Sequence, residues 1–164
     1  DIYPRDTYRV AADHLANSDP IGHAVIGFAL AQTLYGTRTQ SRALLESDDG
    51  RLTRLREGTV TTTPELSFLP KDAAGDTTDD AEPETLPEPL TGDEAVSMNA
   101  MVLQRDIFDR LASALDASTA DEVYLPDVVA DLVTDGVEVR VLHSDGACHG
   151  LTYAEDVSTI AALL

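Results

Sequence analysis

Hydrophobic residues along this chain form two continuous runs, residues 23–30 and 95–103, that are apolar at almost every position. Such runs are typical of strands buried on both faces. Asn99 interrupts the second run, although an amide is costly to bury without a partner. Residues 137–142 alternate in hydrophobicity, which predicts a further strand, suited to the edge of a sheet.

Helical spacing of apolar residues predicts helices between these strands. Pro126 suits the first turn of one of them, and Asp135-Gly136 ends it. The expected helices cover residues 8–16, 107–115, 127–134 and 155–164.

The segment Asp48-Asp49-Gly50 is the strongest hairpin signal in the sequence, and it predicts paired strands over 41–47 and 52–57. Residues 64–94 differ in composition, because they hold five prolines and many acidic side chains. We expect a mobile acidic loop there. The order of elements predicts a mixed-sheet α/β sandwich, and 164 residues suffice for one domain.

The chain carries a formal net charge of −19, and Lys71 is its only lysine. A surface this acidic repels phosphate backbones, so nucleic-acid binding is disfavoured. The acidity fits either a disordered acidic segment or a protein from a high-salt cytoplasm. We favour the halophilic cytoplasmic protein, since 43% of the residues are hydrophobic.

A single cysteine, Cys148, allows no disulfide within the chain and indicates a reducing compartment. No apolar run is long enough to span a membrane, and no signal peptide is visible. Asp1 opens the sequence as if in mid-chain, so we expect a piece of a longer product. Cys148 and His149 are neighbours, and a core thiol beside a surface imidazole is the interpretation we favour. No histidine pair has helical metal-ligand spacing, which makes a zinc site improbable.

Several short motifs, taken together and in order, resemble the sugar-1-phosphate nucleotidylyltransferase family. They cover nearly the whole chain apart from residues 64–94. The motifs are Asp1-Ile-Tyr-Pro-Arg-Asp, Thr33-Leu-Tyr-Gly followed by Ser41-Arg42, Glu57, Val96-Ser-Met-Asn, Glu122-Val-Tyr-Leu-Pro-Asp and Gly150-Leu-Thr-Tyr-Ala-Glu-Asp.

The resemblance implies a Rossmann-like three-layer sandwich with a mixed sheet, here as an incomplete domain. It also implies a reaction in which a sugar phosphate oxygen attacks the α-phosphorus of a nucleoside triphosphate and pyrophosphate leaves. Mg²⁺ would assist this step. Asp1 matches one member of the family's metal-binding Asp-Asp pair.

By the same resemblance, Glu57 accepts sugar hydroxyls and Asn99 presents its amide to the sugar. Ala43 stands where the family commonly has a glycine beside the sugar, and Arg42 meets phosphate. From the residues alone, Glu57 could equally be an exposed carboxylate at the end of a strand. Likewise, Asn99 could be satisfied by backbone and Arg42 could be a surface charge.

The family's Gly-rich triphosphate loop is absent from these residues, so we expect the chain to supply mainly the sugar-binding part and to be inactive alone. The expected partners are a nucleoside triphosphate, a sugar 1-phosphate, and a missing N-terminal half or a second copy of the chain. The alternative is a catalytically inactive binding or assembly module of the same ancestry.

Overall fold

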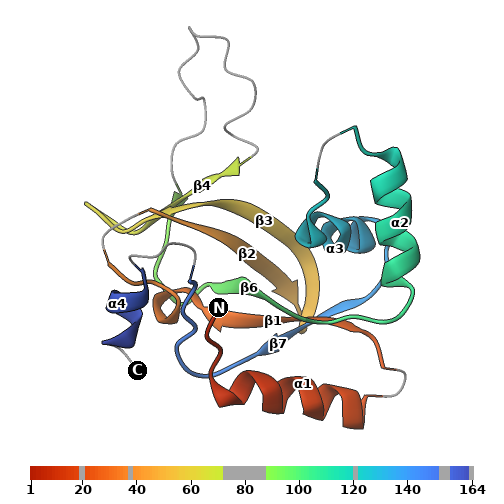
Figure 1. Cartoon of the computed structure of the whole chain (residues 1–164), viewed down its shortest axis with the longest axis horizontal. Helices are drawn as coiled ribbons and strands as arrows, with labels where there is room; N and C mark the ends of the chain where they lie inside the picture. The colour runs from red at the N-terminus through yellow and green to blue at the C-terminus, as the bar shows by residue number, and fades with distance from the viewer. Residues whose placement is uncertain (19–20, 37–38, 72–87, 120–121, 152–155, 163–164) are drawn as a thin grey trace, which may run out of the picture.

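The computed structural model describes residues 1–18, 21–36, 39–71, 88–119, 122–151 and 156–162 (Figure 1). The elements, in chain order, are α1 (Arg5–Asn17), β1 (His23–Ala29), the 3-10 helix η1 (Leu30–Gln32), β2 (Gln40–Asp48), β3 (Arg51–Thr61), β4 (Ser67–Pro70), β5 (Glu88–Pro89), β6 (Ala95–Val102), α2 (Ile107–Ala117), α3 (Leu125–Thr134), β7 (Val139–His143) and α4 (Asp156–Ala161).

Five strands close into a barrel in the order β2-β6-β1-β7-β3, and the pairing of β3 with β2 completes the ring. The β1–β7 pair is parallel, whereas the other pairs are antiparallel. The short strands β4 and β5 extend the sheet outward from β3. In Figure 1, β2 and β3 arch over β6, β1 and β7.

The prediction of a Rossmann-like three-layer α/β sandwich is therefore wrong, because the sheet is a closed mixed barrel. The expectation rested on the family resemblance and on the order of elements, in which the apolar runs were assigned to sheet strands buried on both faces. A barrel strand satisfies the same pattern, since one face points into the barrel and the other can be covered from outside. Hydrophobic periodicity does not distinguish the two arrangements.

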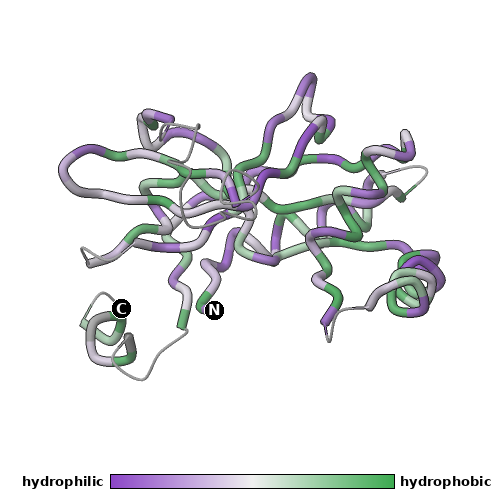
Figure 2. The backbone as a smooth tube through the Cα atoms, turned by 90° about the horizontal axis from the view of Figure 1, so that it is seen from above, coloured by the Kyte–Doolittle hydropathy of each residue, from purple (hydrophilic) through white to green (hydrophobic). Residues whose placement is uncertain are grey.

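Alternate residues of β1 enter two different hydrophobic clusters, which explains why this strand is apolar throughout. Val25 belongs to a cluster to which β1, β2, β3, β7, α2 and α3 contribute. Ile26 and Phe28 belong to another, which includes residues of β2, β3, β4 and β6. Figure 2 shows hydrophobic segments running along the central strands. Both faces of β1 are thus removed from water.

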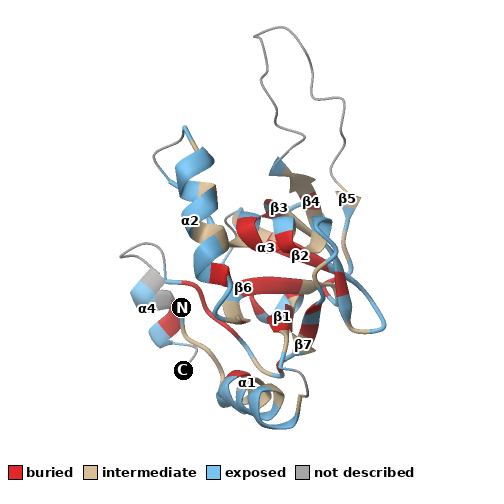
Figure 3. Ribbon diagram, turned by 90° about the vertical axis from the view of Figure 1, so that its right-hand side faces the viewer, coloured by how far each residue is buried: buried red, intermediate tan, exposed pale blue. Residues whose placement is uncertain are grey.

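Buried residues lie mainly on the barrel strands, whereas the outward surfaces of α1 and α2 are exposed (Figure 3). The exposed side chains include Phe108 and Leu115 on α2, two of the apolar positions that predicted this helix. Ile107 is buried, and Leu111 packs against the core. No helix in the described part of the chain is long and apolar enough to cross a membrane.

The hairpin prediction is confirmed. Strands β2 and β3 are joined by Asp49 and Gly50, with φ of 47° and 71°. Two central residues with positive φ are the requirement of a type I′ turn, which matches the twist of the paired strands.

Three other expectations need correction or fall partly outside the described residues. Strand β7 is not at an edge, because it pairs with both β1 and β3. The expected loop 64–94 contains β4 and β5, and its centre, residues 72–87, lies outside the described residues. Glu57 lies within β3, which continues to Thr61, and not at the end of its strand.

Candidate functional site

A cavity of about 430 Å³ opens at the edge of the barrel where β2, β3, β4 and β6 come together. All five residues that the resemblance singled out line this cavity. The complete lining is Asp1, Ser41, Arg42, Ala43, Glu57, Gly58, Thr59, Leu69, Pro70, Lys71, Ser97, Met98 and Asn99.

The strand register explains why these side chains meet. Ala43 on β2 lies opposite Glu57 on β3 and opposite Ser97 on β6. Ser41 lies opposite Thr59 in the same way. Side chains of directly paired residues point to the same face of a sheet, so these five share one face. Ser41, Glu57, Thr59 and Ser97, which we call the polar row, therefore share this face with the methyl group of Ala43.

Asn99 reaches the cavity because β6 bulges. In the β1–β6 pairing, Val25 lies opposite Met101, but Gly27 lies opposite Ser97, so Ile26 faces three residues of β6. Asn99, within this bulge, has φ of 59°. Asparagine tolerates this left-handed conformation better than most side chains. The Asn99 side chain is exposed beside the cavity, although it lies in the run predicted to be buried on both faces.

Glu57 is the acceptor on the β3 side of the cavity. Its side chain is 32% exposed, and its Oε2 lies 3.3 Å from Nζ of Lys71. Hydrogen bonding to Glu57 raises the pKa of Lys71 above its ordinary value. The sequence motifs did not include Lys71. The only feature of the sequence that could have drawn attention to it is that it is the single lysine of the chain.

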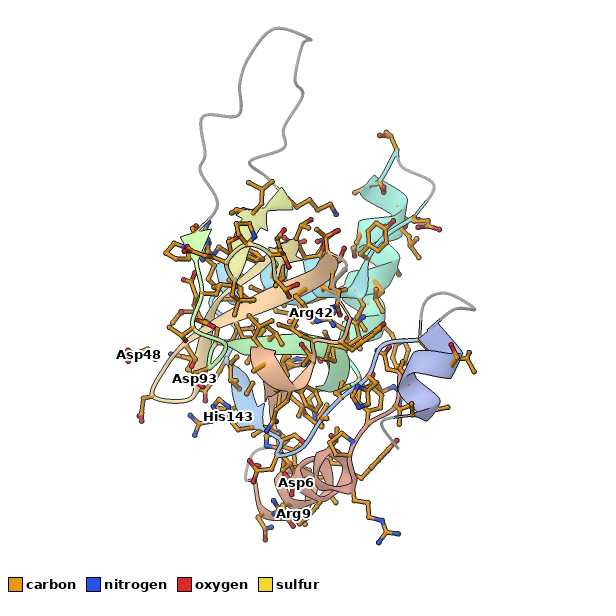
Figure 4. All side chains as sticks on the ribbon, turned by 90° about the vertical axis from the view of Figure 1, so that its left-hand side faces the viewer. Asp6, Arg9, Arg42, Asp48, Asp93 and His143 are labelled. Atoms are coloured by element: carbon orange, nitrogen blue, oxygen red, sulfur yellow. The ribbon has the colours of Figure 1, made fainter. Side chains whose placement is uncertain are left out.

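Arg42 lines the cavity, but its guanidinium is occupied by neutral acceptors. By register its side chain leaves β2 on the face opposite to that of Ala43. It donates to Oγ1 and the carbonyl of Thr33, to Oε1 of Gln40 and to the carbonyl of Ser41. Burial lowers the pKa of Arg42. Figure 4 shows Arg42 near the middle of the strands, distant from the exposed Asp48.

Asp1 is an exposed carboxylate in the cavity lining, contributed by the N-terminal segment. The hydroxyl of Tyr3 donates its one proton to the carbonyl of Met98 at 2.7 Å and lies 3.3 Å from Oδ2 of Asp1. No group of three or more His, Cys, Asp or Glu side chains among the described residues could hold a metal ion. Asp1 is therefore not part of a cluster of three or more such side chains within the described residues.

Comparisons with known proteins assign neither a family nor a function to this cavity. No family model matches this chain, and no curated protein matches it significantly. The cavity and its chemistry are therefore the basis on which a function is proposed.

Cys148 and His149 do not form a reactive pair. Cys148 is fully buried, and burial raises the pKa of its thiol to about 11, which keeps it protonated and unreactive at neutral pH. His149 is only 8% exposed, so the expectation of a surface imidazole is wrong. It packs edge-on against Tyr35, with 6.3 Å between ring centroids.

Proposed function

We propose that the cavity binds a sugar 1-phosphate and that this binding serves nucleotidyl transfer. The observation that carries the proposal is the convergence of Asp1, Arg42, Ala43, Glu57 and Asn99 on one cavity. These residues come from the N-terminal segment, β2, β3 and β6, and the sequence motifs alone singled them out. The closed barrel gives no support from the fold, so the proposal depends on the site.

The cavity has the composition that a phosphorylated sugar requires. Glu57 offers carboxylate acceptors, and Asn99 offers an amide, to the hydroxyl groups of a sugar. The polar row adds the hydroxyls of Ser41, Thr59 and Ser97. A volume of about 430 Å³ lies within the usual range of small-molecule sites. In the proposed reaction, an oxygen of the bound sugar phosphate attacks the α-phosphorus of a nucleoside triphosphate and pyrophosphate leaves. The described residues orient the nucleophile.

The alternative is a binding or assembly module without catalysis. The observation that favours it is that, within the described ranges, no three or more His, Cys, Asp or Glu side chains form a group that could hold a metal. A magnesium requirement remains a prediction, tested by titration with and without MgCl₂. Magnesium commonly takes only one or two protein carboxylates together with substrate phosphates and water, so Asp1 is the residue to examine.

The proposed setting is the cytoplasm of a halophile, supported by the net charge of −19. The proposed partner is either a missing N-terminal half or a second copy of the chain. Exposed apolar side chains on two helices support a protein partner of this kind. They are Tyr8, Leu15, Phe108 and Leu115.

The test is titration calorimetry of the chain, in about 2 M NaCl to screen its charge, with glucose 1-phosphate, mannose 1-phosphate and N-acetylglucosamine 1-phosphate. Each sugar phosphate is added with and without MgCl₂ and nucleoside triphosphate. We expect saturable binding of at least one of them. Glu57→Gln keeps the size of the side chain and removes its charge, and we expect its Kd to rise about tenfold or more.

The matched control is Glu65→Gln, which removes one negative charge from an exposed residue outside the cavity lining. Its Kd should equal that of the unaltered chain. Binding that needs Mg²⁺ and nucleotide together would favour the enzyme, and binding without them would favour the module. Failure of every sugar phosphate to bind would overturn both.

A further inference from the structure

Lys71 is the one cationic side chain in the cavity lining whose donors are directed to a carboxylate. The lining contains two cationic side chains, Arg42 and Lys71. Arg42 makes four hydrogen bonds to neutral oxygens and is held in place by them. Lys71 is 60% exposed and donates to Glu57 at 3.3 Å. An ion pair this exposed contributes little to stability, so a ligand can replace it readily.

A second element supports Lys71 from outside the cavity. Nζ of Lys71 lies 5.3 Å from the centroid of the Tyr124 ring, a cation–π distance. Tyr124 immediately precedes α3, and its hydroxyl donates to Oε2 of Glu122 at 2.8 Å. It does not belong to the cavity lining. Lys71 is therefore placed between an acceptor on β3 and an aromatic face at the start of α3.

A ligand with hydroxyl groups and one anionic group matches this arrangement. Hydroxyls of the ligand would donate to Glu57 in place of Lys71, and the freed ammonium would donate to the anionic group. Glu57 and Lys71 would then each have a hydrogen-bond partner on the ligand. A neutral sugar that bound to Glu57 would instead leave Lys71 without an anionic partner. The arrangement selects a phosphorylated sugar over the free sugar.

We propose that Lys71 binds the phosphate of the ligand and that Tyr124 is a positioning residue that holds the Lys71 ammonium over the cavity. This inference rests on the proposed sugar-phosphate function and adds Lys71, which lies in none of the motifs, and Tyr124, to which the motifs gave no role. Tyr124 acts only through Lys71, so its effect depends on the aromatic ring and not on the hydroxyl.

The test compares the affinities for glucose 1-phosphate, glucose and inorganic phosphate, or the corresponding set for whichever sugar phosphate binds. The ratio of sugar phosphate to free sugar affinity is the readout. Lys71→Gln should lower this ratio about tenfold or more, the usual loss for a charge-assisted hydrogen bond, with little change for the free sugar. Lys71→Arg should retain most of the ratio because it retains the charge.

Tyr124 is tested with a matched pair of variants. Tyr124→Leu removes the ring and should lower the ratio, whereas Tyr124→Phe keeps the ring and should leave it unchanged. Arg105→Gln removes one positive charge from an exposed residue outside the lining and should not change the ratio. Because Lys71 is the only lysine, ¹⁵N labelling of lysine gives one side-chain NMR signal. Its chemical shift should change with sugar phosphate concentration and give the same Kd as calorimetry.

The two proposals fail in different ways. If the sugar phosphate binds and Glu57→Gln weakens it, but Lys71→Gln leaves the ratio unchanged, the role of Lys71 is overturned and the proposed function stands. An unmoved lysine signal at saturation would have the same meaning. If no sugar phosphate binds to the unaltered chain, the proposed function is overturned, and the role of Lys71 with it.

Discussion

The backbone N–H of Asn99 donates to Oγ of Ser97 at 3.1 Å, across the bulge in β6. Ser97 is buried and lies in the polar row opposite Ala43, whereas Asn99 is exposed and has a positive φ. The Ser97 hydroxyl thus satisfies a backbone donor that the bulge removes from the strand ladder. One residue stabilises the turn of the backbone, and the other presents its side chain to the cavity.

Substitutions of Asn99 should separate binding from stability. Glycine adopts positive φ freely, so the free energy of unfolding of Asn99→Gly should stay close to that of the unaltered chain. Asn99→Ala should lower it by about 1 kcal/mol, because alanine is strained in this conformation. Both variants lose the amide and should bind sugar phosphate more weakly. Urea unfolding and calorimetry measure the two effects, and equal stability of both variants would contradict the backbone argument.

A side chain at Gly58 should destabilise the barrel. A Cβ at this position would lie 2.4 Å from the carbonyl oxygen of Leu69 and 2.4 Å from Cζ of Phe68, so β3 and β4 would have to separate. We expect Gly58→Ala to lower the free energy of unfolding by about 1–3 kcal/mol, as overpacking usually does. Gly22→Ala is the control, because a Cβ there meets no atom within 4 Å. Urea midpoints at an unchanged m-value provide the comparison.

Asp6 should make the stability of the chain depend on acid pH. Its Oδ2 accepts the backbone N–H of Asp145 at 2.9 Å, and its Oδ1 accepts from Arg9 (Figure 4). The hydrogen bond from Asp145, followed by that from Arg9, lowers the pKa of Asp6 below its ordinary 3.8. A lowered folded pKa gives stability that is fully present above pH 3.8 and is lost as pH falls through the folded value.

Asp6→Asn should therefore be less stable than the unaltered chain at pH 7, and the difference should shrink below pH 3.8. Unfolding by urea at a series of pH values between about 2 and 7 measures this. Asp116→Asn, on the exposed surface of α2, controls for the loss of one negative charge. A difference for Asp6→Asn that stays constant over the whole range would contradict the assignment.

Salt should stabilise the whole chain. With a net charge of −19 on 164 residues, the negative side chains repel one another. Salt screens this repulsion, because the screening length falls from about 10 Å at 0.1 M salt to about 3 Å at 1 M. We expect the midpoint of thermal unfolding to rise between these concentrations at pH 7. Near pH 4.2, the isoelectric point of the sequence, the net charge is small and the rise should largely disappear. A midpoint independent of salt at pH 7 would exclude self-repulsion as a major destabilising effect.

The sequence alone determined most of the local structure. Asp49 and Gly50 predicted the hairpin because their residue types favour the positive φ of a type I′ turn. Pro126 in the first turn of α3 reflects a similarly local constraint. The apolar runs predicted β1 and β6 because burial on both faces requires apolar side chains at every position. Each of these predictions depends on the chemistry of neighbouring residues.

Closure of the barrel was decided only by tertiary structure, because periodicity does not specify which strands pair. The same is true of the face on which Glu57 lies. Counted from the turn, the register Asp48↔Arg51 and Ser47↔Leu52 would place Arg56 opposite Ala43. An irregularity between Glu46 and Ser47 shifts the pairing by one residue and places Glu57 there instead. A one-residue shift moves every later side chain to the other face.

Some residues of the candidate site were therefore predictable from the sequence, whereas their arrangement was not. The motifs selected residues that line one cavity, but its geometry depends on one register shift in the hairpin and on one bulge in β6. The contact between Lys71 and Glu57 depends in addition on the pairing of β3 with β4. Pairings of this kind reflect packing between segments distant in the sequence, so they become visible only once the chain is folded.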